Sequence, residues 1–332
     1  MTELTYADVK RRQTRVRVSI LIVLTLLTIG QVKAFKQEQS LANSDNTLTI
    51  SGPWEFTSLE PSKQGYIFTR MQIIETLLNI DEHGQLLPGL AQAWQVLEQG
   101  RIWQFKLRSD VIFHDGQLLN AAAVTKSLTI ALQSHGVLRQ APIESIKALD
   151  DLTVQVQLTQ AYAPLGAMLA NYSTAILSQS AYNDEGQVVH LYGTGPYRLM
   201  SFEPPHKLLV SRFDEYWGEQ GSILFASYLT GHRAESRILQ AKSGEADIVF
   251  TLDPGMTSHL KKDDGVTVHT FDTPRTLILK LNSSHPFLTF KARQALSLAI
   301  DRMAISEHVM HGAGEATNQL LPASMQAWHL SN

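Results

Sequence analysis

Short segments with strand-like and helix-like patterns alternate irregularly from residue 47 onward, and this alternation limits the folds that the chain can adopt. Apolar residues at every second position predict strands at Thr47–Ser51 and around Phe105. Helical spacing predicts helices at Tyr66–Leu78 and after Asn120, whose residue type commonly caps helices. Strands interleaved with helices are typical of the α/β class. The sequence therefore predicts an α/β fold with mixed sheets.

Further elements follow from the same patterns. Turn-forming residues between two alternating apolar runs predict two hairpins, 143–149 with 153–158 and 198–202 with 207–212. Strands are also expected at 223–228, 246–250, 266–271 and 276–281, and helices at 235–243, 290–300 and 305–311. The sequence contains no internal repeat, which excludes a solenoid or a propeller.

Composition excludes several functional classes. The chain of 332 residues is 44% hydrophobic and 18% charged, as in a soluble globular protein. Its formal net charge of -3 provides no basic surface for nucleic acid. The absence of cysteine excludes disulfides, thiolate nucleophiles, cysteine-bound metals and a lipid-modified cysteine anchor.

The N-terminus has the pattern of a targeting segment. Basic residues between Lys10 and Arg17 precede the apolar run from Val18 to Ile29, and compact residues precede position 35. This pattern predicts a cleavable secretory signal peptide at residues 1–34, followed by a polar leader at 35–46. The alternative is an uncleaved membrane anchor. An acidic exported chain without cysteine is expected in the periplasm.

The usual catalytic motifs are missing from the sequence. It contains neither a phosphate-binding P-loop nor a G-x-S-x-G nucleophile motif nor an H-E-x-x-H metal motif. Residues 193–196 (GTGP) are interpreted as a turn into a strand, because proline removes a donor that a phosphate loop needs. Residues 114–116 (HDG) are interpreted as a tight turn, and His308 with His311 as surface histidines. No enzyme activity and no metal site are expected.

Aromatic residues and isolated arginines lie near the ends of predicted elements. Aromatic walls and a guanidinium are suited to binding a small polar ligand that carries a carboxylate. The alternative for each aromatic residue is a place in the core. The candidates are Trp54, Phe56, Tyr66, Phe68, Arg70, Arg139, Tyr162, Tyr172 and Arg275.

An ordered set of segments carries a family resemblance. The segments are 74–78 (IETLL), 87–91 (LPGLA), 103–116 (WQFKLRSDVIFHDG), 193–197 (GTGPY), 214–218 (DEYWG), 244–248 (GEADI) and 293–302 (RQALSLAIDR). In this order they resemble the extracytoplasmic solute-binding proteins, family 5, of peptide and nickel ABC transporters. Residues 146–149 (IKAL) and 154–158 (VQVQL) are most similar to the nickel-binding branch.

The resemblance implies a periplasmic-binding-protein-like fold (class II, cluster C) whose two lobes close on a ligand. Residues 47–260 would form lobe I, and residues 261–332 an incomplete lobe II, because family members are about half as long again. The implied function is binding of a nickel chelate or a short peptide for an inner-membrane ABC permease, by a monomer without catalysis or cofactor. The alternative is a single-lobe remnant that acts as an interaction or sensor protein without a transported ligand.

The ligand-binding residues expected on this basis are Tyr66, Phe68, Arg70, Arg139, Asn171 and Tyr172. The nickel-binding branch carries an arginine in a Pro-rich segment of the cleft wall. The matching stretch here, residues 170–174 (ANYST), has no arginine. Arg139 or Arg70 is the expected substitute.

Overall fold

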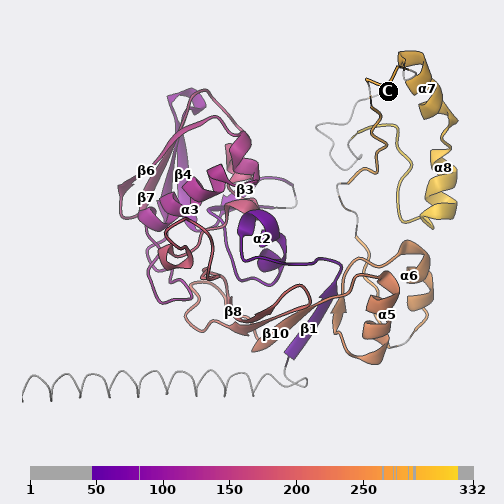
Figure 1. Ribbon diagram of the computed structural model, residues 1–332, viewed down its shortest axis with the longest axis horizontal. Helices are drawn as coiled ribbons and strands as arrows, with labels where there is room; N and C mark the ends of the chain where they lie inside the picture. Colours follow the sequence, from indigo (N-terminus) through magenta and orange to yellow (C-terminus); the bar gives the residue numbers. More distant parts are fainter. Residues whose placement is uncertain are drawn as a thin grey trace, which may run out of the picture. The chain divides into compact units, whose positions relative to one another are not determined.

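The structure is a computed structural model that describes residues 47–320, except positions 82, 264, 272, 274, 283, 287 and 288 and the side chains of 258 and 259. The expected signal peptide and leader lie outside the described residues. The chain divides into two compact units between Thr230 and Gly231 (Figure 1), and each unit is described by itself. The sequence predicts the lobe boundary further along the chain, at residue 260, and that assignment stays a prediction.

A mixed sheet forms the base of the first unit. Its strands β1 (Thr47–Gly52), β10 (Phe225–Thr230), β9 (Lys207–Arg212) and β8 (Tyr197–Glu203) are neighbours in that order. The β1 and β10 strands are parallel, whereas β10, β9 and β8 pair antiparallel. The helix α2 (Pro61–Arg70) packs on this sheet through a core that includes Phe56, Phe68, Leu208 and Tyr228. The predicted first strand and the predicted hairpin at 198–212 are confirmed.

A second, antiparallel sheet of the same unit contains β4 (Ala91–Leu97), β5 (Ile102–Leu107), β7 (Thr153–Leu158) and β6 (Ile143–Asp150). The helix α3 (Ala121–Gln133) runs beside it in Figure 1, and the two share a hydrophobic core. The side chain of Asn120 accepts a hydrogen bond from the Ala123 backbone N–H at 2.9 Å, so the predicted cap is confirmed. The predicted hairpin at 143–158 is also confirmed.

Short elements complete the first unit. The strands β2 (Leu78–Ile80) and β3 (Leu86–Pro88) form a small hairpin that the sequence patterns did not predict. The remaining helical turns are η2 (Glu98–Gly100), η3 (Val137–Gln140), α4 (Leu165–Met168), η4 (Tyr172–Thr174) and η5 (Gln179–Ala181).

The predicted helix at Tyr66–Leu78 is wrong in its bounds, because α2 begins at Pro61 and ends at Arg70. The chain turns at Gln72, whose φ of 55° lies in the left-handed region. Beyond it, backbone carbonyls pair with a distant segment: Gln72 accepts from the Tyr197 N–H at 3.2 Å, and Ile73 from the Gly195 N–H at 3.1 Å. Apolar residues at helical spacing are therefore used here in an extended segment buried on both sides.

The turn at residues 193–196 is confirmed as an entry into a strand, since β8 begins at Tyr197. Its glycines permit close backbone contact. A Cβ atom added at Gly195 would lie 2.1 Å from the backbone oxygen of Gln72, closer than two such atoms can approach.

Replacing Gly195 by alanine is expected to lower the unfolding free energy of the first unit by about 1–3 kcal/mol, because the backbone must shift to remove the clash. Urea unfolding followed by tryptophan fluorescence measures the loss. Gly314→Ala is the control, because a Cβ there meets nothing within 4 Å. Equal unfolding midpoints for the two variants would show that the close approach carries no cost.

The second unit begins with α5 (Ala234–Ser243), which ends at Gly244 in the left-handed region with φ 74°, as the sequence predicts. The Arg237 side chain is buried, and its guanidinium donates hydrogen bonds to the backbone oxygens of Gly231, His232, Phe250 and Thr251. The other elements are β11 (Ile248–Val249), α6 (Pro254–Leu260), α7 (Phe290–Ala299), α8 (Arg302–Ala304) and the π-helical turn η6 (Ile305–Val309).

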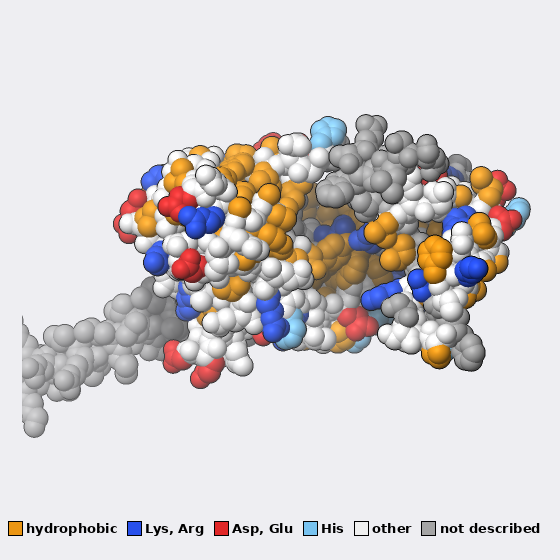
Figure 2. All heavy atoms as spheres, turned by 90° about the horizontal axis from the view of Figure 1, so that it is seen from above, with side chains coloured by type: hydrophobic (Ala, Val, Ile, Leu, Met, Phe, Trp, Pro, Cys, Tyr) orange, Lys and Arg blue, Asp and Glu red, His pale blue; other side chains and the backbone are white. Residues whose placement is uncertain are grey.

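The strands expected at 266–271 and 276–281 are wrong for the residues that the structure describes. A strand needs a neighbour that pairs with its N–H and C=O groups. In the described part of this unit the only strand is β11, which has two residues. Apolar side chains of these segments consequently stay exposed, with Leu277 89% and Phe271 77% accessible. Figure 2 shows hydrophobic side chains on the surface of this unit. Within the described residues of the chain, no helix is both long and apolar enough to cross a membrane.

Candidate functional site

A cavity of about 410 Å³ opens in the first unit. It lies where the end of α2 and the extended segment after it meet the turn around residue 170 and the loop that follows β9. Its lining residues are Thr69, Gln72, Ile74, Glu75, Thr76, Asn79, Ala170, Tyr172, Pro196, Tyr216 and Glu219. The cavity has the size of a small-molecule site.

One wall of the cavity is organised around the carboxylate of Glu75. The hydroxyl of Thr194 donates to Oε2 at 2.7 Å, and the indole N–H of Trp217 donates to the same atom at 2.9 Å. The phenol of Tyr216 donates to Oε1 at 3.0 Å. Thr194 and the pair Tyr216 and Trp217 lie on two separate loops, each more than a hundred residues after Glu75 in the sequence. One carboxylate thereby joins three segments of the chain.

The positive charge of Arg108 also acts on the Glu75 carboxylate. The Arg108 guanidinium lies over the ring of Trp217, 4.2 Å from its centroid, and its Nε donates to the Gly89 backbone oxygen at 2.8 Å. Burial raises the pKa of Glu75 above its usual value, although the three donors and Arg108 act in the opposite direction. Burial also raises the pKa of Tyr216, and the neighbouring charge of Glu75 adds to that effect. The Tyr216 phenol therefore stays a neutral donor at physiological pH.

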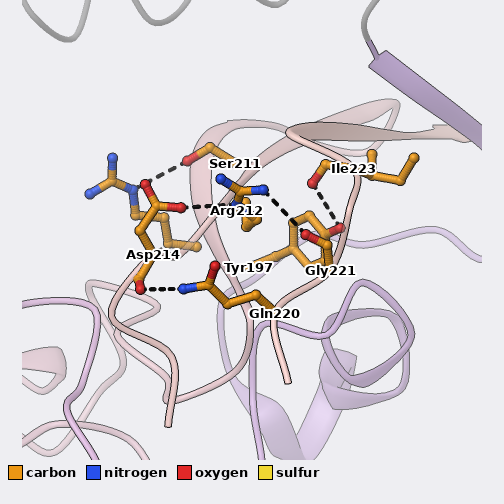
Figure 3. Close-up of polar contacts among 8 residues, drawn as sticks. Tyr197, Ser211, Arg212, Asp214, Gln220, Gly221 and Ile223 are labelled. Atoms are coloured by element: carbon orange, nitrogen blue, oxygen red, sulfur yellow. Dashed lines mark hydrogen bonds and ion pairs between the residues drawn. The ribbon is translucent and has the colours of Figure 1, made fainter. Parts of the chain in front are cut away.

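The loop that carries Tyr216 and Glu219 is fixed at both ends (Figure 3). Near its start, Arg212 Nε donates to Asp214 Oδ1 at 2.9 Å, and the Gln220 amide donates to the Asp214 backbone oxygen at 2.6 Å. Near its end, the Tyr197 hydroxyl donates to the Ile223 backbone oxygen at 3.0 Å. These bonds hold the backbone of the loop in place beside the cavity.

Three of the residues expected to bind ligand lie together beside this cavity. Tyr66 and Tyr172 meet edge to face, with ring centroids 6.1 Å apart. The Arg70 guanidinium lies 4.4 Å from the ring centroid of Tyr66 and 4.8 Å from that of Trp54. Gly65 permits this approach, because a Cβ there would lie 2.8 Å from the Tyr172 backbone oxygen. Of the three, only Tyr172 lines the cavity itself.

The other expected ligand residues are more dispersed. Asn171 caps η4, where its side chain accepts a hydrogen bond from the Ser173 backbone N–H at 3.0 Å. Arg139 lies exposed on η3, which contacts η4 through the hydrogen bond from the Val137 N–H to Ser173 Oγ. Phe68 requires a correction: it is fully buried and packs near Phe202, so a core role explains it better than a ligand contact.

Sequence patterns did not single out Glu75, Thr194 or Trp217, although all three lie within the quoted family segments. No spacing rule brings residues 75, 194 and 217 together, because their proximity depends on the whole fold of the unit. The turn at 114–116 is confirmed, with Asp115 Oδ1 accepting from the Gln117 N–H at 3.1 Å. In the part of the chain that the structure describes, no three metal-ligating side chains are grouped as a metal site.

Comparisons with known proteins identify the relatives of this chain. The model of the bacterial extracellular solute-binding proteins, family 5, middle part, matches residues 85–332. The dipeptide-binding protein of Escherichia coli strain K12 is 27% identical over 274 residues, which are 74% of this chain and 51% of that protein.

Solved structures are also similar. A nickel ABC transporter protein from Bacillus halodurans is 30% identical with a TM-score of 0.70, over 83% of this chain and 58% of that one. NikA from Staphylococcus aureus, solved in complex with Ni(L-His)2, has a TM-score of 0.76 at 22% identity, over 84% of this chain and 59% of that one. The fold is that of the periplasmic binding proteins, as the sequence predicts. The chain spans about half to three-fifths of the length of these relatives.

Proposed function

This chain belongs to the bacterial extracellular solute-binding proteins of family 5, and from this premise we propose that it serves as the solute-binding component of an ABC importer. The observation that carries the proposal is the family match over residues 85–332. Members of the family bind solutes and do not convert them, which agrees with the absence of catalytic motifs from the sequence. The chain is therefore not an enzyme.

The proposed solute is a short peptide or a nickel chelate, the ligand classes named for its relatives. The cavity beside Glu75 and Tyr172 is the proposed site within the first unit. Its volume suits part or all of such a ligand. The cluster of Trp54, Tyr66, Arg70 and Tyr172 supplies aromatic surface and a guanidinium next to it.

The remaining parts of the proposal follow from the family and the N-terminus. The family is extracellular, and residues 1–34 would direct export to the periplasm. An inner-membrane ABC permease is the proposed partner, and the chain would act as a monomer. Nickel would be cargo carried in its chelate and not a resident cofactor.

Ligand binding is expected to stabilise the purified chain against heat and urea. At a ligand concentration 100 times Kd, binding adds about 2.7 kcal/mol to the unfolding free energy. Thermal-shift screening with di- to pentapeptides and with nickel–histidine measures this effect, and glucose is the negative control. If no peptide and no nickel chelate raises the melting temperature, the transport function fails for this chain.

A further inference from the structure

The cavity lining has a distinct charge. Among its described lining residues, two are carboxylates, Glu75 and Glu219, and none is lysine, arginine or histidine. The lining therefore favours a cation over an anion. Resting on the proposed function, we infer that this cavity receives the protonated amine of the solute, so that it selects solutes with a free ammonium group over nickel chelates.

Glu219 is the group that meets the ammonium. Glu75 is already engaged by three donors, and Arg108 balances its charge from behind. Glu219 is exposed, and within the described part of the chain its carboxylate has neither a hydrogen bond nor an ion pair. It can therefore pair with a ligand cation without first breaking an internal contact.

Neutral oxygens add to this carboxylate. An ammonium group has three donors and needs three acceptors. The Tyr216 hydroxyl uses its proton on Glu75, which leaves its oxygen to accept. The Asn79 amide nitrogen donates to the Pro88 backbone oxygen at 3.2 Å, so its side-chain oxygen is the group that it offers. Three residues of the lining, Glu219, Tyr216 and Asn79, therefore each have an oxygen that can accept a hydrogen bond, and an ammonium has three donors.

Hydrogen bonds within the loop hold the backbone on both sides of Glu219 before any ligand arrives. Its neighbour Gln220 donates to the Asp214 backbone oxygen, and the Arg212 guanidinium spans the loop from Asp214 to the Gly221 backbone oxygen (Figure 3). A backbone held on both sides of residue 219 lowers the entropy that binding must overcome. By contrast, an amine coordinated to nickel has its lone pair engaged and carries no ammonium charge, so it cannot form an ammonium–carboxylate ion pair with Glu219.

The test compares three probes by isothermal titration calorimetry on the purified chain: trialanine, N-acetyl-trialanine and nickel–histidine. Trialanine is expected to bind at least about 10-fold more tightly than its acetylated form, equivalent to about 1.4 kcal/mol. Glu219→Gln is expected to remove most of that difference and to leave binding of N-acetyl-trialanine unchanged. Glu215→Gln is the matched control, because Glu215 is exposed on the same loop and does not line the cavity.

Each other outcome has a definite meaning. Equal binding of the two peptides, or equal effects of Glu219→Gln and Glu215→Gln, overturns the inference. Binding of nickel–histidine alone also overturns it, while the proposed function stands. Failure of all three probes and of the wider peptide panel overturns both. Equal melting temperatures of the two variants without ligand verify that neither change disturbs the fold.

Discussion

Replacing Glu75 by alanine is expected to lower the unfolding free energy of the first unit by about 3–5 kcal/mol. The change leaves the hydroxyl of Thr194 and the indole N–H of Trp217 without their acceptor, and Arg108 without a balancing charge. It also disconnects the loop that carries Tyr216 from the extended segment after α2. Chemical unfolding followed by tryptophan fluorescence measures the loss, because Trp217 itself reports on this wall.

Two further variants show whether the loss of stability comes from the carboxylate of Glu75. Glu75→Gln keeps an acceptor oxygen but removes the charge, so its loss should be smaller than that of alanine. Glu215→Ala removes an exposed carboxylate from the same loop and should change stability by less than about 0.5 kcal/mol. A Glu75→Ala variant as stable as Glu215→Ala would show that the carboxylate does not join the three segments.

Local elements of the fold could be predicted because their partners are close in sequence. The hairpin of β6 and β7 needs only a turn at Asp150 and Asp151 between two alternating runs. The start of α3 depends on one side chain, Asn120, and one backbone N–H three residues later. In both places the contacts that stabilise the element lie within the window that a sequence pattern covers.

Long-range contacts decide the elements that were missed. The helical pattern after Arg70 is overridden by backbone hydrogen bonds to residues 195 and 197, which the spacing of apolar residues does not encode. The parallel pairing of Thr47 with Phe225 likewise joins the two ends of the unit. The wall around Glu75 has the same origin, since its donors lie at residues 194, 216 and 217.

In the second unit, strand propensity alone did not produce strands. Thr276–Leu281 has the composition of a strand, yet its described residues pair with no other strand. Propensity favours an extended chain, whereas a sheet needs two partners that exchange hydrogen bonds. A sequence pattern therefore predicts such a segment correctly only where a second strand pairs with it.

The pH dependence of stability provides the second large effect, and it centres on His114. The ring Nε2 donates to the Gly195 backbone oxygen at 2.9 Å, and the ring meets Phe213 edge to face. Burial lowers the pKa of His114 from 6.5 to about 4, with a further contribution from the positive charge of Arg198; the Gly195 carbonyl and the charge of Asp115 oppose this. The folded chain therefore keeps His114 neutral at a pH where the unfolded chain protonates it.

The sign of the effect follows from proton binding. Between pH 6.5 and about 4 the unfolded state binds a proton that the folded state does not, so the unfolding free energy falls as the pH falls. At about 1.4 kcal/mol per pH unit, the loss from His114 amounts to about 3 kcal/mol over that range. Glu75 acts oppositely, because its raised pKa gives a contribution that is largest at low pH and is lost as the pH rises.

Comparison with a variant separates the effect of His114 on the pH dependence of stability from that of Glu75. His114→Gln keeps a donor for the Gly195 oxygen but does not titrate, whereas Glu75 is unchanged in both proteins. Urea unfolding at pH 7.0 and 4.5 measures the unfolding free energy of both proteins. Between these two pH values, the wild type is expected to lose about 2–3 kcal/mol more than His114→Gln loses. His135→Gln, at an exposed position, should leave the wild-type pH dependence intact. A constant difference between wild type and His114→Gln across this range would mean that His114 takes up its proton equally in both states, and that its burial against Phe213 has no part in the acid sensitivity of the fold.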